Sequence, residues 1–305
     1  MTAALRLTRV GPSATVQDAG RFGLLQHGIS ASGPMDRGAF DRAGKALGDP
    51  GSAGVEFTLA GLDFVVVGEA LRGGFLGGSF SLRINGVAQS WPYVGDLAPG
   101  DRVEITPGPA GNYGYCRLDR EIGVPLLLGS RSTNLIAALG GLDGRALRAG
   151  DVLPLATVAG SGERDAATPA AVPIDSDPIR FVWGIHADLF APATRRAFTE
   201  ERFTVSNRLD RMGVRLDDPA GVFAGAPILS LVSDAIVAGD VQILGDGTPI
   251  VLMRDHQPTG GYPRIATVIT VDLDRFAQLR PSSTLAFTPI TLQKARRLYL
   301  ESRAR

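Results

Sequence analysis

The stretch Gln17-Asp18-Ala19-Gly20-Arg21-Phe22-Gly23 begins a loop that runs on to Asp36. Between Gln17 and Asp36 it places two carboxylates, an arginine and four glycines in twenty residues. Glycine permits positive φ and a close approach of the backbone, so such a loop can wrap around a small molecule. Arg21 has a planar fork that suits a carboxylate or phosphate, and the two aspartates can orient it. Two interpretations stay open here: a small-molecule site, or tight turns held by a structural ion pair.

The loop leads directly into an expected helix. Apolar residues recur at helical spacing between Asp36 and Leu47, and Gly48 with Pro50 ends the run. Ser32 or Asp36 can cap the first turn. A helix that starts just after a glycine-rich loop favours an anion at its N-terminus, although most helix N-termini bind nothing.

Length and charge limit the class of protein. A chain of 305 residues is longer than most single cores, so we expect two domains: residues 1–160, a linker at 161–178, and residues 179–305. The 31 basic and 31 acidic residues balance, which argues against nucleic acid or an anionic membrane surface as the main partner. No apolar run is long enough to span a bilayer, and residues 1–9 lack the apolar core of a signal peptide. We therefore expect a cytoplasmic protein.

Thirty-nine glycines and twenty prolines separate short apolar segments, which is typical of a mainly β protein. Strands are expected at 5–10, 55–59, 63–67, 81–84, 102–105, 113–118, 124–128, 179–183, 241–244, 250–253 and 265–271. Short helices are expected at 192–199, at 273–279 with Asp272 as the cap, and at 291–302 with Leu292, Ala295, Leu298 and Tyr299 facing inward. The single cysteine, Cys116, excludes an intrachain disulfide and is expected to be a buried strand residue.

Two further polar segments follow the first loop. Residues 129–134 come after the apolar run at 124–128, and residues 255–263 surround His256 with Asp255, Gln257 and Thr259. Of the three histidines, His256 has the best claim to a catalytic task, although a hydrogen-bonding structural histidine is the commoner case. The histidine spacing does not suit a metal site.

Several familiar chemistries are absent from the sequence. No glycine-rich segment ends in the Gly-Lys-Ser/Thr of a nucleotide-binding loop, and no dinucleotide fingerprint follows a first strand. The Gly-x-Ser-x-Gly nucleophile pattern is missing, and no lysine flanked by methionines could carry biotin. The arginines, aspartates, glutamines and hydroxyls that remain can bind and orient a small polar or anionic molecule.

The polar segments together resemble a known family, the biotin-dependent carboxyltransferases, also called the allophanate hydrolase subunit 2 family. The resemblance runs from about Leu5 to Phe287. Its motifs are Thr15-Val16-Gln17-Asp18-x-Gly20-Arg21-x-Gly23, Ser32-Gly33-Pro34-Met35-Asp36, Leu128-Gly129-Ser130-Arg131-Ser132-Thr133, the segment 206–215 around Asp210-Arg211-Met212-Gly213, and Thr259-Gly260-Gly261-Tyr262-Pro263.

The resemblance implies two cyclophilin-like β-barrel domains and an activity shared with other subunits. It implies the C component of an ATP-dependent 5-oxoprolinase complex, which opens 5-oxoproline to L-glutamate. The expected partners are a B component of the KipI type and an A component of the LamB/YcsF type. ATP with Mg²⁺ is expected as a co-substrate of the complex, and no covalent biotin is expected on this chain.

Candidate site residues follow as a hypothesis from the chemistry that the resemblance implies, although His256 does not correspond to a known family role. Arg21 and Arg131 would clamp the substrate carboxylate and phosphoryl oxygens, and Asp255 or His256 would transfer protons. The candidate catalytic residues are thus Asp255, His256 and Arg131. The candidate substrate-binding residues are Gln17, Asp18, Arg21, Asp36, Ser130, Gln257, Thr259, Gly260 and Tyr262.

Two other activities occur in the family and stay open. One is carboxyl transfer from biotin on a separate carrier, as in urea carboxylation or allophanate processing. The other is regulation, in which a KipA-like protein antagonises a kinase inhibitor. The chain departs from the family pattern at residues 118–123, where many relatives resemble Ala-Val-Ala-Gly-Gly-Ile, and at Pro258, where threonine is common.

Overall fold

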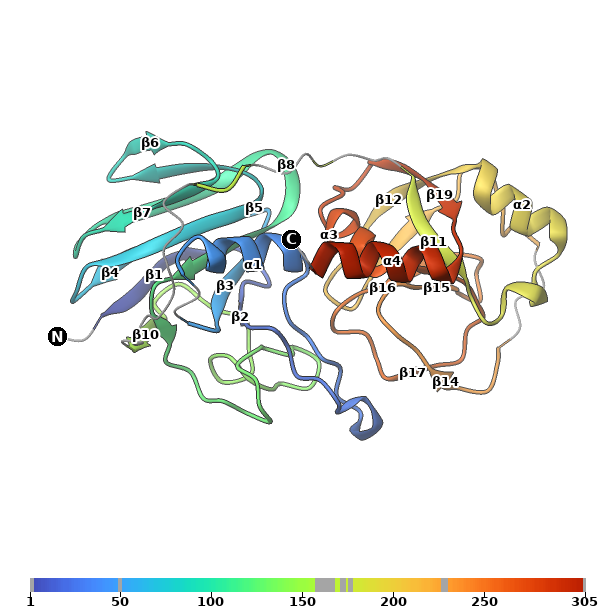
Figure 1. The fold of residues 1–305 in the computed structure, drawn as a ribbon, viewed down its shortest axis with the longest axis horizontal. Helices are drawn as coiled ribbons and strands as arrows, with labels where there is room; N and C mark the ends of the chain where they lie inside the picture. Colours follow the sequence, from blue (N-terminus) through green and yellow to red (C-terminus); the bar gives the residue numbers. More distant parts are fainter. Residues whose placement is uncertain are drawn as a thin grey trace. The chain divides into compact units, whose positions relative to one another are not determined.

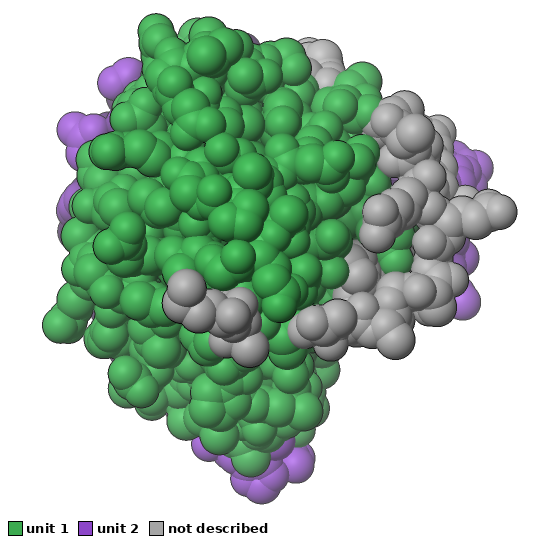
Figure 2. Space-filling model, turned by 90° about the vertical axis from the view of Figure 1, so that its left-hand side faces the viewer, with its two compact units in different colours: residues 1–23, 31–174 green, residues 24–30, 175–305 purple. Residues whose placement is uncertain are grey.

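The computed structural model describes residues 3–48, 51–156, 168–170, 174, 178–225 and 230–303. The chain divides into two compact units, coloured separately in Figure 2. Unit 1 comprises Met1–Gly23 and Ala31–Ile174, and unit 2 comprises Leu24–Ser30 and Asp175–Arg305. Most of the predicted linker, 161–178, lies outside the described residues.

Unit 1 is built on one curled sheet (Figure 1), which contains ten strands within the described residues. The order is β2-β3-β8-β4-β1-β10-β9, and β5 pairs with β8 and also with β6 and β7. The elements are β1 (Ala4–Val10), β2 (Thr15–Gln17), α1 (Arg37–Lys45), β3 (Gly54–Thr58), β4 (Leu62–Val67), β5 (Leu71–Ile84), β6 (Val87–Gln89), β7 (Tyr93–Leu97), β8 (Arg102–Leu118), β9 (Glu121–Ile122) and β10 (Val152–Ala156).

Local sequence signals explain the core of unit 1. In β4 the residues Leu62, Phe64 and Val66 are buried and alternate with partly exposed ones, as the period of a strand requires. Helix α1 begins after Asp36, whose side chain accepts a hydrogen bond from the backbone N–H of Ala39 at 2.8 Å, so Asp36 is the cap of the two that were predicted, and Ser32 is not. Cys116 is buried in β8, and burial raises the pKa of its thiol.

The prediction of separate strands at 102–105 and 113–118 is wrong, because β8 runs unbroken from Arg102 to Leu118. The segment between them contains Pro107 and Pro109, which cannot donate hydrogen bonds to a regular strand ladder. The pairing of β8 with β5 instead shifts register on both sides of Ser79. Such bulges accommodate prolines that a regular ladder would exclude.

The expected strand at 124–128 is also wrong. Leu126, Leu127 and Leu128 are 57%, 42% and 59% exposed, and this run carries no strand beyond an isolated bridge between Leu127 and Ser130. Leu128 and Gly129 both have positive φ, at 51° and 79°, and form the tight turn within that bridge. The apolar composition of residues 124–128 predicts a strand, whereas the chain makes a surface turn at Leu128 and Gly129.

Unit 2 is a closed barrel in the order β11-β18-β15-β16-β13-β12-β19, with a separate two-stranded sheet of β14 and β17 (Figure 1). Strands β11 and β19 pair in parallel and close the barrel. The elements are η1 (Leu25–His27), β11 (Ile179–Trp183), η2 (Ala187–Leu189), α2 (Pro192–Glu200), β12 (Arg202–Leu209), β13 (Gly213–Asp217), β14 (Asp234–Ala235), β15 (Asp240–Ile243), β16 (Pro249–Leu252), β17 (Thr259–Gly260), β18 (Arg264–Val268), α3 (Thr270–Ala277), β19 (Thr284–Pro289) and α4 (Leu292–Arg303).

Aromatic side chains fill much of the interior of unit 2. Phe198 of α2 stacks on Phe287 of β19, with ring centroids 4.7 Å apart. Phe181, Phe203 and Phe223 surround this pair at centroid distances of 5.3, 5.6 and 6.0 Å from Phe198. Buried aromatic pairs at such distances add to the hydrophobic gain of burial. Unit 1 is built on a curled sheet and unit 2 on a closed barrel, so the mainly β prediction, with a barrel-like sheet in each half, is confirmed.

Two details of the predicted helices in unit 2 are wrong. Ile269 precedes α3 as its N-cap residue, whereas Asp272 lies in the first turn and pairs with Arg180 and Arg275. In α4, Leu292 and Tyr299 are 68% and 42% exposed and do not face inward. None of the helices in the described ranges is long and apolar enough to cross a membrane.

Candidate functional site

Asp18 is the centre of a polar network in unit 1. Its Oδ1 accepts hydrogen bonds from the hydroxyls of Ser130 and Ser132, both at 2.6 Å, and its Oδ2 accepts one from the backbone N–H of Arg131 at 2.6 Å. Burial opposes the charged form, but these bonds and one from the backbone N–H of Gly20 hold the pKa of Asp18 below its ordinary value. The Asp18 carboxylate thus orders residues 130–132.

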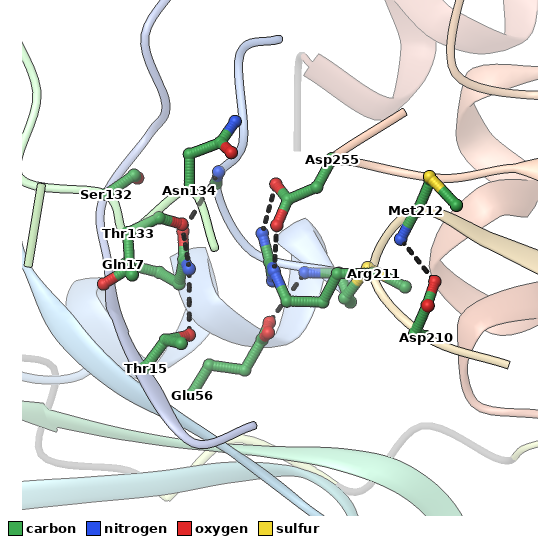
Figure 3. A network of polar contacts seen from close by, with 12 residues as sticks. Thr15, Gln17, Glu56, Ser132, Thr133, Asn134, Asp210, Arg211, Met212 and Asp255 are labelled. Carbon is green, nitrogen blue, oxygen red and sulfur yellow. Dashed lines mark hydrogen bonds and ion pairs between the residues drawn. The ribbon is translucent and has the colours of Figure 1, made fainter. Parts of the chain in front are cut away.

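Gln17, at the end of β2, ties three parts of unit 1 together (Figure 3). Its Nε2 donates to the hydroxyl of Thr15 at 2.9 Å and to the carbonyl of Thr133 at 3.0 Å. Its Oε1 accepts from the backbone N–H of Gly33 at 3.1 Å. This amide is buried and positions the loop, and substrate contact by Gln17 stays a prediction.

Arg21 is 1% exposed and is directed at backbone carbonyls. Its Nε donates to Leu127 at 3.0 Å, and its Nη2 donates to Ser130 at 3.2 Å and Ser132 at 3.0 Å. These acceptors are more than one hundred residues away in the sequence, so Arg21 holds segment 127–132 against the first loop. Its predicted contact with substrate is not tested by this arrangement.

Arg131 is held differently, by its backbone more than by its side chain. The backbone N–H donates to Asp18, while Nη1 lies 3.4 Å from the hydroxyl of Ser52 and 3.6 Å from Glu121 Oε2. Among the described residues its Nε is buried and has no hydrogen-bond partner, and its side-chain contacts use Nη1 alone. A guanidinium has five N–H donors, so Arg131 keeps donors that an anion could take. This arginine is the better placed of the two predicted clamps.

A buried chain of hydrogen bonds fixes the loop at Met35 and Asp36. The backbone N–H of Asp36 donates to the Tyr115 hydroxyl at 2.7 Å, and that hydroxyl donates to Glu56 Oε2 at 2.9 Å. Glu56 also accepts from the backbone N–H of Met35 at 2.8 Å (Figure 3). Burial, together with the Glu56 carboxylate, raises the pKa of Tyr115 well above its ordinary value, so it stays a hydroxyl donor.

Unit 2 holds the second group of predicted residues, starting with Asp255. Its Oδ2 accepts from Arg211 Nε at 2.8 Å and its Oδ1 from Arg211 Nη2 at 3.1 Å (Figure 3). The two side chains are 2% and 4% exposed. Asp210 stabilises the adjoining turn by accepting from the backbone N–H groups of Met212 at 2.7 Å and Gly213 at 3.1 Å. The turn and the ion pair together fix the orientation of Asp255.

His256 is buried, and its Nδ1 lies 2.7 Å from the carbonyl oxygen of Gln257. A carbonyl can only accept, so Nδ1 carries the proton and Nε2 keeps its lone pair. Burial lowers the pKa of His256, and the hydrogen bond to Gln257 opposes this only partly. A neutral imidazole with an unprotonated Nε2 can act as a general base at neutral pH.

The remaining predicted residues of unit 2 lie at or near the surface. Thr259 and Gly260 form β17, which pairs with Asp234 and Ala235 of β14. The side chains of Gln257, Thr259 and Tyr262 are at least partly exposed, Tyr262 by 39%. These residues are accessible to a small molecule, which fits their predicted task without testing it.

Several residues of these networks were not among the predicted site residues. Ser132 and Thr133 belong to the family motif at residues 128–133, and Arg211 belongs to the family motif around Asp210. Glu56 could have been found as a lone carboxylate in the apolar strand segment Val55-Glu56-Phe57. Tyr115 gave no comparable signal, because its partners come from distant segments.

The fold and the polar networks define a class: a mainly β protein with a closed barrel in one unit, a curled sheet in the other, and loops rich in arginine, aspartate and glutamine. The family model described as carboxyltransferase domain, subdomain A and B, matches residues 27–289. The chain therefore belongs to this carboxyltransferase-domain family.

Relatives of known name are similar over nearly the whole chain. The C subunit of 5-oxoprolinase from Haemophilus influenzae is 34% identical over 294 residues, which cover 93% of this chain and 91% of that protein. The C subunit of 5-oxoprolinase from Escherichia coli is 34% identical over 297 residues, covering 95% and 93%. Among solved structures, the urea amidolyase of Kluyveromyces lactis superposes with a TM-score of 0.89 at 26% identity. That match covers 99% of this chain but only 20% of the amidolyase.

Proposed function

We propose that this chain is the C subunit of a 5-oxoprolinase, which opens 5-oxoproline to L-glutamate as ATP is consumed. The observation that carries the proposal is the 34% identity to two C subunits over more than nine-tenths of their lengths. Other subunits complete the enzyme. We propose a B component of the KipI type and an A component of the LamB/YcsF type as those partners, in the cytoplasm.

The reaction needs activation because an unstrained lactam resists hydrolysis. Transfer of the terminal phosphoryl group of ATP to the lactam oxygen would turn that oxygen into a leaving group. Water then adds to the lactam carbonyl carbon, and the ring C–N bond breaks as the nitrogen takes up a proton, which leaves an acyl phosphate. A second water hydrolyses this acyl phosphate to the glutamate carboxylate and free phosphate. Such steps need clamps for the substrate carboxylate and phosphoryl oxygens, and a group that moves protons.

Arg131 has the properties of the clamp in unit 1. Its backbone is fixed by Asp18, while the contacts of its guanidinium within the described residues, at 3.4 and 3.6 Å, use Nη1 alone. Arg21, Gln17 and Ser130 would act by ordering the segment that carries Arg131. Arg21 thus serves in this proposal as a positioning residue.

His256 has the properties of the proton-transfer group in unit 2. Its Nδ1–H is committed to the carbonyl of Gln257, and its lowered pKa keeps Nε2 free to accept a proton near pH 7. Asp255 is held by two hydrogen bonds from Arg211, which suits a positioning task. The exposed side chains of Thr259 and Tyr262 would contact the substrate.

One observation favours a second candidate function, carboxyl transfer. The family description names a carboxyltransferase domain, and the urea amidolyase of Lachancea kluyveri is 31% identical over 97% of this chain. The chain spans only 17% of that amidolyase. A carboxyltransferase of this size would act on biotin carried by another protein, since no lysine here suits biotin attachment.

The test is reconstitution. The chain is co-purified with the proposed KipI-type and LamB/YcsF-type partners, and glutamate release from 5-oxoproline is measured with and without ATP. We expect ATP-dependent release by the complex and none by the chain alone. Turnover of urea with a biotin carrier, and none of 5-oxoproline, would contradict the proposal and favour carboxyl transfer.

A further inference from the structure

Glu121 of β9 lies next to the proposed clamp. Its Oε2 is 3.6 Å from Nη1 of Arg131, and the two side chains are 15% and 23% exposed. Both groups also contact Ser52: its hydroxyl donates to Glu121 Oε2 at 2.8 Å and accepts from Arg131 Nη1 at 3.4 Å. A carboxylate of the protein therefore stands beside the guanidinium that would receive the carboxylate of a substrate.

The Glu121 carboxylate is satisfied without Arg131. Its Oε2 accepts from the backbone N–H of Ser52 at 2.9 Å in addition to the hydroxyl. Its Oε1 accepts from the backbone N–H groups of Ala53 and Ile122, each at 3.1 Å. Four donors hold the charge in place, so movement of Arg131 away from Glu121 leaves no unpaired carboxylate.

The pair is thus asymmetric. Glu121 is fixed and fully hydrogen-bonded, whereas Arg131 makes long contacts and has an Nε without a partner among the described residues. An anion that offers two oxygens at about 2.7–2.9 Å, the usual range for charge-assisted bonds, forms stronger contacts with Arg131 than Glu121 does. A neutral molecule does not form charge-assisted hydrogen bonds of this strength with Arg131.

We propose that Glu121 is a specificity-determining residue that competes with the substrate carboxylate for Arg131. This inference rests on the proposed function, because it assumes that Arg131 binds an anionic substrate. Glu121 weakens the binding of every anion at Arg131. A substrate that offers two oxygens to the Arg131 guanidinium overcomes this competition, and an anion that offers only one oxygen does not.

The test uses the reconstituted complex with Glu121→Gln. Removal of the competing charge lowers KM for 5-oxoproline about two- to fivefold, the scale of a partly exposed ion pair, with kcat unchanged. The inhibition constant of 2-pyrrolidinone, the same lactam without the carboxylate, stays constant. In an Arg131→Gln background the effect of Glu121→Gln on KM disappears.

Glu69→Gln is the matched control, because Glu69 also pairs with an arginine of unit 1, Arg120 at 3.1 Å, and forms no described ion pair with Arg131. It leaves KM unchanged. If the Glu121→Gln chain does not assemble into the complex, Glu121→Asp is used instead. It keeps a carboxylate for the four donors but moves it away from Arg131 by one methylene, so we expect KM for 5-oxoproline to fall again. An unchanged or raised KM in either variant overturns the inference. An unsubstituted complex without 5-oxoproline turnover contradicts the proposed function instead.

Discussion

Arg211 and Asp255 form a two-pronged ion pair inside unit 2, with Nε–Oδ2 at 2.8 Å and Nη2–Oδ1 at 3.1 Å. The backbone N–H of Asp255 also donates to the carbonyl of Arg211 at 2.7 Å. Two turns that are 44 residues apart in the sequence are therefore joined by main chain and side chain together. The pair anchors the start of the segment that carries His256 and Thr259.

Asp255→Asn tests this anchor. Removal of the Asp255 charge takes from the buried Arg211 its two-pronged carboxylate partner, so we expect the free energy of unfolding of unit 2 to fall by about 3–5 kcal/mol. Urea unfolding followed by the fluorescence of Trp183 in a Trp91→Phe background measures unit 2. Asp188→Asn is the control, because Asp188 pairs with Arg195 at 2.6 Å but is 94% exposed. Its expected cost is below about 1 kcal/mol, and equal costs would refute the anchor.

Arg21→Ala and Arg131→Ala separate a structural arginine from a binding one. Loss of Arg21 leaves the carbonyls of Leu127, Ser130 and Ser132 without this donor, so we expect unit 1 to lose about 2–4 kcal/mol of unfolding free energy. Loss of Arg131 is expected to raise KM for 5-oxoproline about 10- to 100-fold with little change in stability. Unchanged activity in both variants would remove the clamp from the proposed mechanism.

Features that depend on neighbouring residues could be predicted from the sequence, whereas contacts between distant segments, such as those of Arg21, could not. The helix at 36–47 and its Asp36 cap depend on neighbours within about four residues, so spacing alone predicted them. The acceptors of Arg21 lie more than one hundred residues away, and the continuity of β8 depends on bulges against β5. Pairings of this kind are tertiary, and residue type alone does not specify them.

Because of Asp18, we expect the stability of unit 1 to fall at low pH. Its pKa is lowered in the folded chain, so its contribution is present above the ordinary value of 3.8 and is lost as pH falls through the folded-state pKa. Asp18→Asn should therefore destabilise the protein most at neutral pH, and the difference from the wild type should shrink below about pH 4. Unfolding free energies between about pH 3 and 8 measure this. The exposed Asp143→Asn should parallel the wild type, and a pH-independent gap for Asp18→Asn would contradict the assignment.

Position 260 is expected to require glycine, because a larger side chain would be too close to its neighbours. A Cβ added there would lie 2.6 Å from Gln242 Nε2 and 3.2 Å from Ile236 Cδ1, both in the interior of unit 2. We expect Gly260→Ala to cost about 1–3 kcal/mol of stability and to disturb the pairing of β17 with β14. Gly245→Ala is the matched control, since a Cβ there meets nothing within 4 Å. If both substitutions are neutral, the close approach of Gln242 to Gly260 does not restrict this position.

His256→Gln tests the proton-transfer assignment in two ways. In the complex we expect kcat to fall about 100-fold or more, as for loss of a general base, with a smaller change in KM. Burial lowers the pKa of His256 below 6.5, so the unfolded chain binds the proton more readily and the wild type loses stability as pH falls below about 6.5. His256→Gln should weaken this loss between about pH 7 and 5. The exposed His27→Gln should retain both the wild-type kcat and the wild-type pH dependence. A His256→Gln complex with wild-type kcat would shift the proton-transfer task to Asp255.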